Sequence, residues 1–114
     1  MTIRYKNASK ILDGTAMTTV LTISTSAVAI VKSVYVSNNS TNNVLVNCDL
    51  RDASASTDIE FFRKDVPGSS TVNATEQGLN LEAGDAITVQ AATGSNKIQG
   101  LISYALIDRR NENG

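Results

Sequence analysis

Four carboxylates gather in the middle of the sequence, where the chain shows its clearest potential for chemistry. They are Asp49, Asp52, Asp58 and Glu60. A pair of carboxylates could serve glycoside hydrolysis. The three aspartates could bind calcium, although the D-x-[DN]-x-[DN]-G spacing of a calcium loop is absent. Three cations lie nearby and favour a simpler interpretation, in which the acids are solvated or form ion pairs with them: Arg51, Arg63 and Lys64.

Other catalytic chemistry lacks its residues. The chain contains no histidine, which excludes nucleophile–histidine–acid catalysis and histidine-ligated metal sites. A single cysteine, Cys48, excludes a thiolate zinc site and an intramolecular disulfide. Cys48 alternates in phase with Val44, Val46 and Leu50, so we predict a small core side chain rather than a reactive thiol. Phosphate-binding glycine motifs are also absent. We therefore predict a non-enzymatic protein without a cofactor.

The composition favours β-structure and argues against two classes of partner. The chain has 114 residues, with 12 threonines, 12 serines and 11 asparagines, and these residues disfavour helix interiors. Ten basic and eleven acidic residues give a net charge of −1 without a basic block, so we expect no direct contact with nucleic acid. The longest apolar run, Ala27–Val31, is too short to span a membrane, and the N-terminal residues do not resemble a signal peptide.

Alternation of apolar and polar residues, not helical spacing, organises the chain. Within Gly78–Ala91, a tight two-strand unit turns at Ala83-Gly84-Asp85, where Gly84 is expected to need a positive φ. Ala8–Leu12 could form one helical turn. The other predicted strands are Thr2–Lys6, Thr18–Ser24, Val28–Asn38, Asn43–Leu50, Asp58–Lys64, Thr71–Ala74 and Ile98–Ile107.

These elements predict an all-β fold of about eight short strands in one domain, an antiparallel β-sandwich or jelly roll spanning residues 1–114. Residues 1–14 are a candidate N-terminal arm, and residues 108–114 form a polar tail. Ile98–Ile107 is apolar on both faces, so we place it centrally in a sheet. In the long strand Val28–Asn38, we expect Ile30, Val34 and Val36 on one face and a bulge or sheet margin that lets Lys32 reach solvent.

Several strands carry apolar residues on both faces, as in Val44-Leu45-Val46 and Phe61-Phe62. A two-layer sandwich has one core, so the surplus predicts an oligomer or a docking surface. Lys32 and Tyr35 are candidates for a surface that meets a partner chain. The full set of candidate partner contacts is Arg4, Tyr5, Lys32, Tyr35, Phe62, Arg109 and Arg110.

The order of three segments resembles a known type of protein. An N-terminal strand containing Tyr5 and Lys6 is followed by VAIVKSVYVSNNS, then by GLNLEAGDAITVQA, and finally by ISYALI. This order is similar to that of small β-sandwich virion proteins of tailed bacteriophages, over about Ile3 to Ile107. Members of that type are head decoration (cement) proteins or small parts of the tail and its fibres.

The resemblance implies a mechanical role and a place in the virion after synthesis in the bacterial cytoplasm. The partners would be the major capsid protein or other virion proteins, and the chain would form a homo-oligomer. Edge strands and terminal arms could contact them by β-augmentation, with Thr2–Lys6 and Asp108–Gly114 as candidates. Head decoration is the leading interpretation, and a tail, adaptor or fibre-associated protein is the alternative. A carbohydrate-binding sandwich is disfavoured because the chain has few aromatic residues.

Overall fold

The computed structural model describes residues 2–12, 14–75, 78–92 and 97–108. These residues form nine strands. They are β1 (Thr2–Leu12), β2 (Thr18–Thr22), β3 (Ala27–Asn38), β4 (Val44–Asp52), β5 (Thr57–Val66), β6 (Ser70–Asn73), β7 (Leu79–Leu81), β8 (Ala86–Ala91) and β9 (Ile98–Asp108). This described part contains no helix that is long and apolar enough to cross a membrane.

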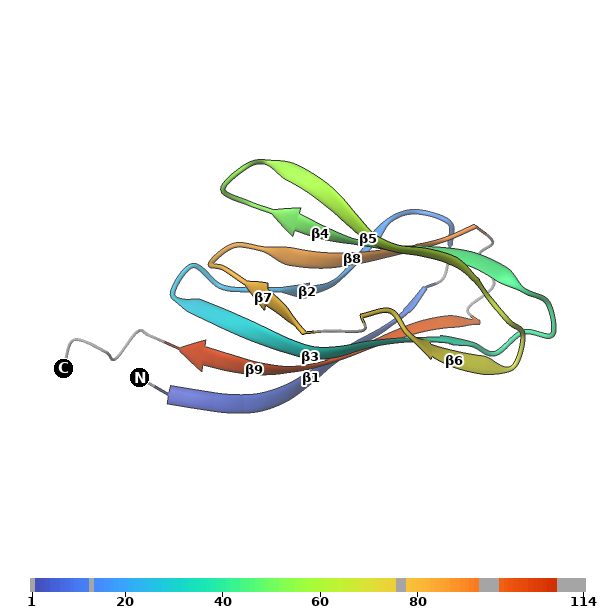
Figure 1. The fold of residues 1–114 in the computed structure, drawn as a ribbon, viewed down its shortest axis with the longest axis horizontal. Coiled ribbons are helices and arrows are strands. Elements are labelled where there is room, and N and C mark those ends of the chain that lie inside the picture. The colour runs from blue at the N-terminus through green and yellow to red at the C-terminus, as the bar shows by residue number, and fades with distance from the viewer. Residues whose placement is uncertain (1, 13, 76–77, 93–96, 109–114) are drawn as a thin grey trace.

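The strands form two antiparallel sheets that face each other (Figure 1). Sheet A has the order β1-β9-β3-β6, with β7 also paired to β3, and sheet B has the order β2-β8-β4-β5. The pairs are nested, because β1 pairs with β9, β2 with β8, β3 with β6 and β7, and β4 with β5. A long hairpin rolled up in this way is a jelly roll. The predicted β-sandwich is therefore confirmed.

One core lies between the inner faces of the two sheets. Sheet A contributes fully buried side chains from β3 and β9, and sheet B contributes others from β4 and β8. The most deeply buried include Val31, Val34, Val36, Ile102, Val46, Cys48, Ile87 and Val89. The predictions that Cys48 points inward and that β9 lies between two other strands are both confirmed.

Strand β1 is longer than predicted, and the expected helical turn over Ala8–Leu12 is wrong. All eleven residues of β1 pair with β9 in an unbroken register that ends at Leu12 opposite Ile98. Ala8 packs against the core and Leu12 belongs to it. The spacing of four residues between them was compatible with a helix, but the pairing with β9 places both on the inner face of a strand.

A β-bulge in β3 overturns the predicted placement of Ile30. The pairing of β3 with β9 shifts between Val31 and Ser33, so Lys32 is an extra residue that lies exposed. The bulge prediction for Lys32 is confirmed. Because one extra residue exchanges the two faces of a strand, Ile30 points outward and is 47% exposed, while Val34 and Val36 are buried.

The turn between β7 and β8 forms as the sequence predicts. Gly84 has a φ of 87°, in the left-handed region that glycine occupies without steric cost. The backbone N–H of Gly84 donates to the carbonyl of Ile23, and the N–H of Ile23 donates to the carbonyl of Asp85. This turn therefore anchors the segment that follows β2.

Candidate docking surface

The outer face of sheet A is the surface of β1, β9 and β3 that points away from the core. Directly opposed residues of antiparallel strands share a face, so the register defines five rows across these strands. The rows are Ile3–Ile107–Val28, Tyr5–Ala105–Ile30, Asn7–Ser103–Ser33, Ser9–Leu101–Tyr35 and Ile11–Gln99–Ser37. The large apolar side chains occur in the first two rows and in the last two rows. The middle row is polar.

Exposed apolar side chains concentrate on this one face. Nine large hydrophobic residues are exposed in the part of the chain that the structure describes, and six belong to this face: Ile3, Tyr5, Ile11, Ile30, Tyr35 and Leu101. The other three are dispersed, at Met17, Leu45 and Ile59. The five rows contain no carboxylate and no cation, and Lys32 lies beside them on the bulge. Exposed apolar side chains that gather on one sheet face are typical of an interaction surface.

A groove of about 840 Å³ crosses one end of this face. Three of the exposed apolar side chains line it, from three different strands: Ile11 of β1, Leu101 of β9 and Tyr35 of β3. Polar groups surround them, from Ser9, Lys10, Ser37, Thr71 and Gln99. The hydroxyls of Ser37 and Thr71 lie 2.9 Å apart and join β3 to β6. An apolar floor with a polar margin is the arrangement found at protein interfaces.

The other end of the face carries a cation over an aromatic ring. The Nζ atom of Lys32 lies 5.0 Å from the centroid of the Tyr5 ring. The bulge positions Lys32 for this contact, which contributes about 0.5–1 kcal/mol at an exposed site. Between the two ends, Ser103 Oγ donates to Asn7 Oδ1 at 2.8 Å. This end of the face therefore presents a cation and an aromatic ring in contact with each other.

The outer face of sheet B is charged, in contrast. Opposed pairs there include Arg51 with Asp58, and Asp49 with Glu60. Arg51 and Asp58 form an ion pair at 3.5 Å, and Arg63 donates to Glu60 at 3.0 Å. The predicted pairing of acids with Arg51 and Arg63 is thus confirmed. The two outer faces therefore differ, because sheet A presents exposed apolar side chains and sheet B presents ion pairs.

The structure brings three of the predicted partner contacts onto the outer face of sheet A. Tyr5, Lys32 and Tyr35 lie on it. Arg4 is exposed on the opposite side of β1, and Phe62 is half-buried against the core, where it lines a smaller cavity of about 310 Å³. Arg109 and Arg110, and most of the tail Asp108–Gly114, lie outside the described residues.

Sequence reasoning missed the apolar residues that complete this face. Ile3 and Ile11 belong to β1, but the polar residues between them obscured the alternation. Alternation alone predicts Ile30 on the same face as Val34 and Val36, which are buried. Leu101 was recognised only as part of a strand that is apolar on both faces. The alternation Ile3, Tyr5, Asn7, Ser9, Ile11 would have revealed the outward set, had β1 been extended to Leu12.

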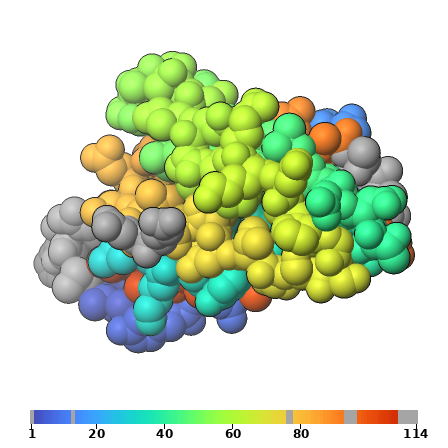
Figure 2. Space-filling view, turned by 45° about the vertical axis from the view of Figure 1, so that its right-hand side comes forward, coloured from blue at the N-terminus to red at the C-terminus, as the bar shows by residue number. Residues whose placement is uncertain are grey.

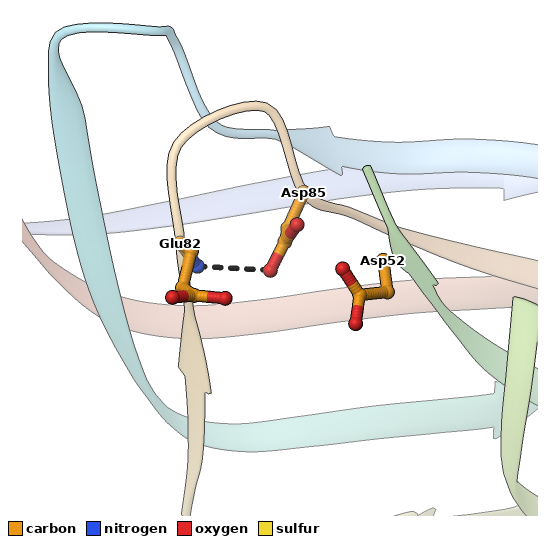
Figure 3. A group of neighbouring side chains, drawn as sticks. All are labelled: Asp52, Glu82 and Asp85. Atoms are coloured by element: carbon orange, nitrogen blue, oxygen red, sulfur yellow. Dashed lines mark hydrogen bonds between the residues drawn. The ribbon is translucent and has the colours of Figure 1, made fainter. Parts of the chain in front are cut away.

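Of the carboxylates in the described residues, three come together, but not the set considered from the sequence. Asp52, Glu82 and Asp85 have carboxylate oxygens within 4.8 Å of one another (Figure 3). Asp85 is buried, and both its oxygens accept backbone hydrogen bonds, from Ala53 N at 3.0 Å and from Glu82 N at 2.9 Å. These bonds tie the β7–β8 turn to the end of β4. The geometry of Asp85 is therefore explained by its structural role.

Asp52 is held by its own turn. Its Oδ1 accepts hydrogen bonds from Ser54 Oγ at 2.9 Å and from Ala55 N at 3.3 Å. These hydrogen bonds, the one from Ser54 first, lower the pKa of the Asp52 carboxyl below its ordinary value. The carboxylate thus stabilises the β4–β5 connection, which has Ser56 at a positive φ of 52°.

Burial raises the pKa of the Cys48 thiol from 9.0 to about 12, and the neighbouring Asp49 charge adds to the effect. Because the folded protein holds the proton more tightly than the unfolded chain, this contribution to stability is complete below pH 9 and is lost as the pH rises toward 12. We expect the free energy of unfolding of the wild type to fall more steeply over this range than that of Cys48→Val. Denaturant titrations at several pH values measure the difference, and parallel curves would contradict the prediction.

No protein-family model matches the sequence, and no curated protein matches it. Solved structures do share the fold. A chain of the acid-stable capsid of Helicobacter pylori bacteriophage KHP30 superposes with a TM-score of 0.60 at 10% identity, covering 93% of this chain and 87% of that one.

Two further structures are similar at low identity. A chain of the IBDV T13 viral particle has a TM-score of 0.56 at 8% identity, and the match covers 96% of this chain but only 32% of that one. The core of Drosophila NLP has a TM-score of 0.53 at 12% identity, covering 95% and 100%. These likenesses establish a jelly-roll β-sandwich shared with viral capsid chains and with a cellular protein.

Proposed function

We propose that this chain is a non-enzymatic structural protein of a bacteriophage virion that binds other virion proteins through the outer face of sheet A. The observation that carries the proposal is that six of the nine exposed large hydrophobic residues in the described part of the chain lie on this one sheet face. Apolar side chains that stay in water contribute no free energy of burial. A partner that covers this face removes its apolar area from water, which favours binding.

The fold supports the viral part of the proposal. The jelly roll recurs in viral capsid proteins, although it also occurs in lectin domains. The matched chain of the KHP30 capsid is covered over most of its length, so it is a protein of nearly this size and fold within a capsid. The IBDV match shows the same fold as one part of a larger viral chain.

Within the virion we propose head decoration as the specific role. A decoration protein binds the outside of an assembled shell and bridges its subunits, which requires a firm contact on one side and a hydrated surface on the other. The outer face of sheet A supplies the first, with Tyr35 and Leu101 as anchors in its groove. The charged outer face of sheet B supplies the second. A tail or fibre position uses the same surfaces and is distinguished by locating the protein in purified virions.

The direct test measures binding of the purified full chain to shells of the phage that encodes it, prepared without the protein. Tyr35→Lys combined with Leu101→Lys places two charges in the groove of this face, and we expect affinity to fall about a hundredfold or more. Leu45→Lys is the matched control, because Leu45 is 37% exposed on the outer face of sheet B and Leu101 is 40% exposed. The control should bind as the wild type does.

If the wild type and the double variant bound equally well, the outer face of sheet A would not be the surface that contacts the shell. Mass spectrometry of purified virions that finds no copy of the chain would overturn the virion role itself. Recovery of the protein with isolated tails rather than heads would replace decoration by the tail-associated alternative.

A glycan is the second candidate occupant of the groove. The groove presents one aromatic ring, Tyr35, beside the amide of Gln99 and the hydroxyls of Ser37 and Thr71. An apolar surface with a few placed hydrogen-bonding groups suits an oligosaccharide. Binding to a glycan array that is lost in Tyr35→Ala, together with no affinity for shells, would favour this candidate over the virion role.

A further inference from the structure

Strand β1 is an unpaired edge of unusual length. It pairs with β9 over all eleven residues without a register shift, and within the described residues no strand pairs with its other side. An edge strand presents a row of free backbone N–H and C=O groups that can bind another extended strand. Because β1 contains neither a proline nor a bulge, its backbone can bind such a strand along its whole length.

The charges on β1 are of one sign. Arg4, Lys6 and Lys10 are exposed, all lie on the side of the strand that faces away from the Tyr5 ring, and Thr2–Leu12 contains no carboxylate. Charges at an edge prevent indiscriminate pairing. The cations of β1 do not repel a strand that carries acids at the same spacing. They therefore make the edge selective for an acidic strand.

The complementary edge is β5, which ends sheet B and, among the described strands, pairs with β4 alone. Asp58 and Glu60 lie two residues apart on the same face of β5, opposite Arg51 and Asp49 of β4. Arg4 and Lys6 have the same spacing on one face of β1. Figures 1 and 2 show β1, in blue, along the bottom of the molecule and the β4–β5 hairpin, in green, at the top.

The acids of β5 are accessible. Asp58 and Glu60 pair with Arg51 and Arg63 of the same sheet, but the side chains in both ion pairs are 40% exposed or more. Exposed ion pairs contribute little to stability, typically about 0–1 kcal/mol. They can therefore exchange for cations of another molecule at small cost.

We propose that copies of this chain associate head to tail, with β1 of one copy paired antiparallel to β5 of the next. One register places Arg4 opposite Glu60 and Lys6 opposite Asp58. Pairing of β1 with a second β1 would set cations against cations, so the charge pattern favours the unlike edges. A head-to-tail contact uses two different surfaces of each copy and yields a closed ring or a filament. This association is independent of the virion role, because it leaves the outer face of sheet A free.

A charge exchange tests the pairing directly. Arg4→Glu with Lys6→Glu makes both edges acidic, and Asp58→Lys with Glu60→Lys makes both edges basic. We expect each double variant alone to associate at least about tenfold more weakly than the wild type, because like charges then face each other. An equal mixture should regain assemblies in which the two variants alternate. Light scattering coupled to size-exclusion chromatography measures all three samples.

Lys97→Glu is the matched control, because Lys97 is exposed in the connection before β9 and lies on neither edge. It should associate as the wild type does. A mixture that stays as weakly associated as its components would overturn the proposal, as would a wild type that remains monomeric at low salt.

The wild type provides a second measurement that needs no substitution. Salt shortens the range of charge interactions from about 10 Å at 0.1 M to about 3 Å at 1 M, so association should weaken as salt rises. Association that is insensitive to salt would overturn the pairing of charged edges. Circular dichroism of each double variant establishes that the strands are intact.

Discussion

Replacing Asn38 by leucine should lower the free energy of unfolding by about 3–4 kcal/mol, although the two side chains have similar size. Asn38 is fully buried at the end of β3. Its Nδ2 donates to the carbonyls of Asn42 at 2.8 Å and Val66 at 2.9 Å, and its Oδ1 accepts from the N–H and the hydroxyl of Ser40. Leucine would leave these partners without the amide, and the Val66 bond is itself buried.

The measurement is a denaturant titration of the two proteins, with Asn39→Leu as the control. Asn39 is the next residue in the chain but is exposed, and its substitution should change stability by less than about 0.5 kcal/mol. Equal stabilities of the two variants would mean that the Asn38 network does not hold the ends of β3 and β5 together. Gly68 lies in the same region, where a Cβ atom would come within 2.6 Å of the Thr41 backbone.

A comparison of two isoleucine substitutions in sheet A tests which side chains point into the core. Ile102→Ala should cost about 2–5 kcal/mol, because Ile102 is fully buried on the inner face of β9 and its removal leaves a cavity. Ile30→Ala should cost less than about 1 kcal/mol, because Ile30 is 47% exposed on the outer face. Both isoleucines lie within strands that pair on two sides, so backbone pairing is the same for the two substitutions.

The outcome bears on the bulge as well as on the core. If Ile30→Ala were as destabilising as Ile102→Ala, Ile30 would be in the core and β3 would have no bulge at Lys32. The outer face of sheet A would then lose one of its apolar residues, and the docking proposal would weaken with it. Thermal unfolding followed by circular dichroism is sufficient to separate the two cases.

The two-sided character of the molecule follows from its topology. The nested hairpin places β9 between β1 and β3, so the apolar outer residues of three strands align in rows. The same nesting leaves β1 and β5 as edges at opposite sides of the sandwich. The apolar outer face of sheet A and the backbone groups of the two edge strands are therefore separate surfaces of the molecule.

The sequence pattern was sufficient to predict features that depend on a single strand or a single turn. Cys48 is in phase with Val44 and Val46, so its burial could be predicted from alternation alone. The turn at Gly84 could be predicted because glycine supplies a positive φ that other residues resist. The central place of β9 followed from its apolar residues on both faces.

The sequence by itself thus determined the class of fold, the approximate strands, the buried cysteine and the absence of histidine chemistry. Tertiary structure alone decided the outward direction of Ile30, the full length of β1 and the meeting of Asp52 with Glu82 and Asp85. The physical reason is that alternation reports side-chain direction only relative to neighbours in the same strand. A bulge changes that direction, and the pairing of strands distant in sequence determines which faces and which carboxylates come together.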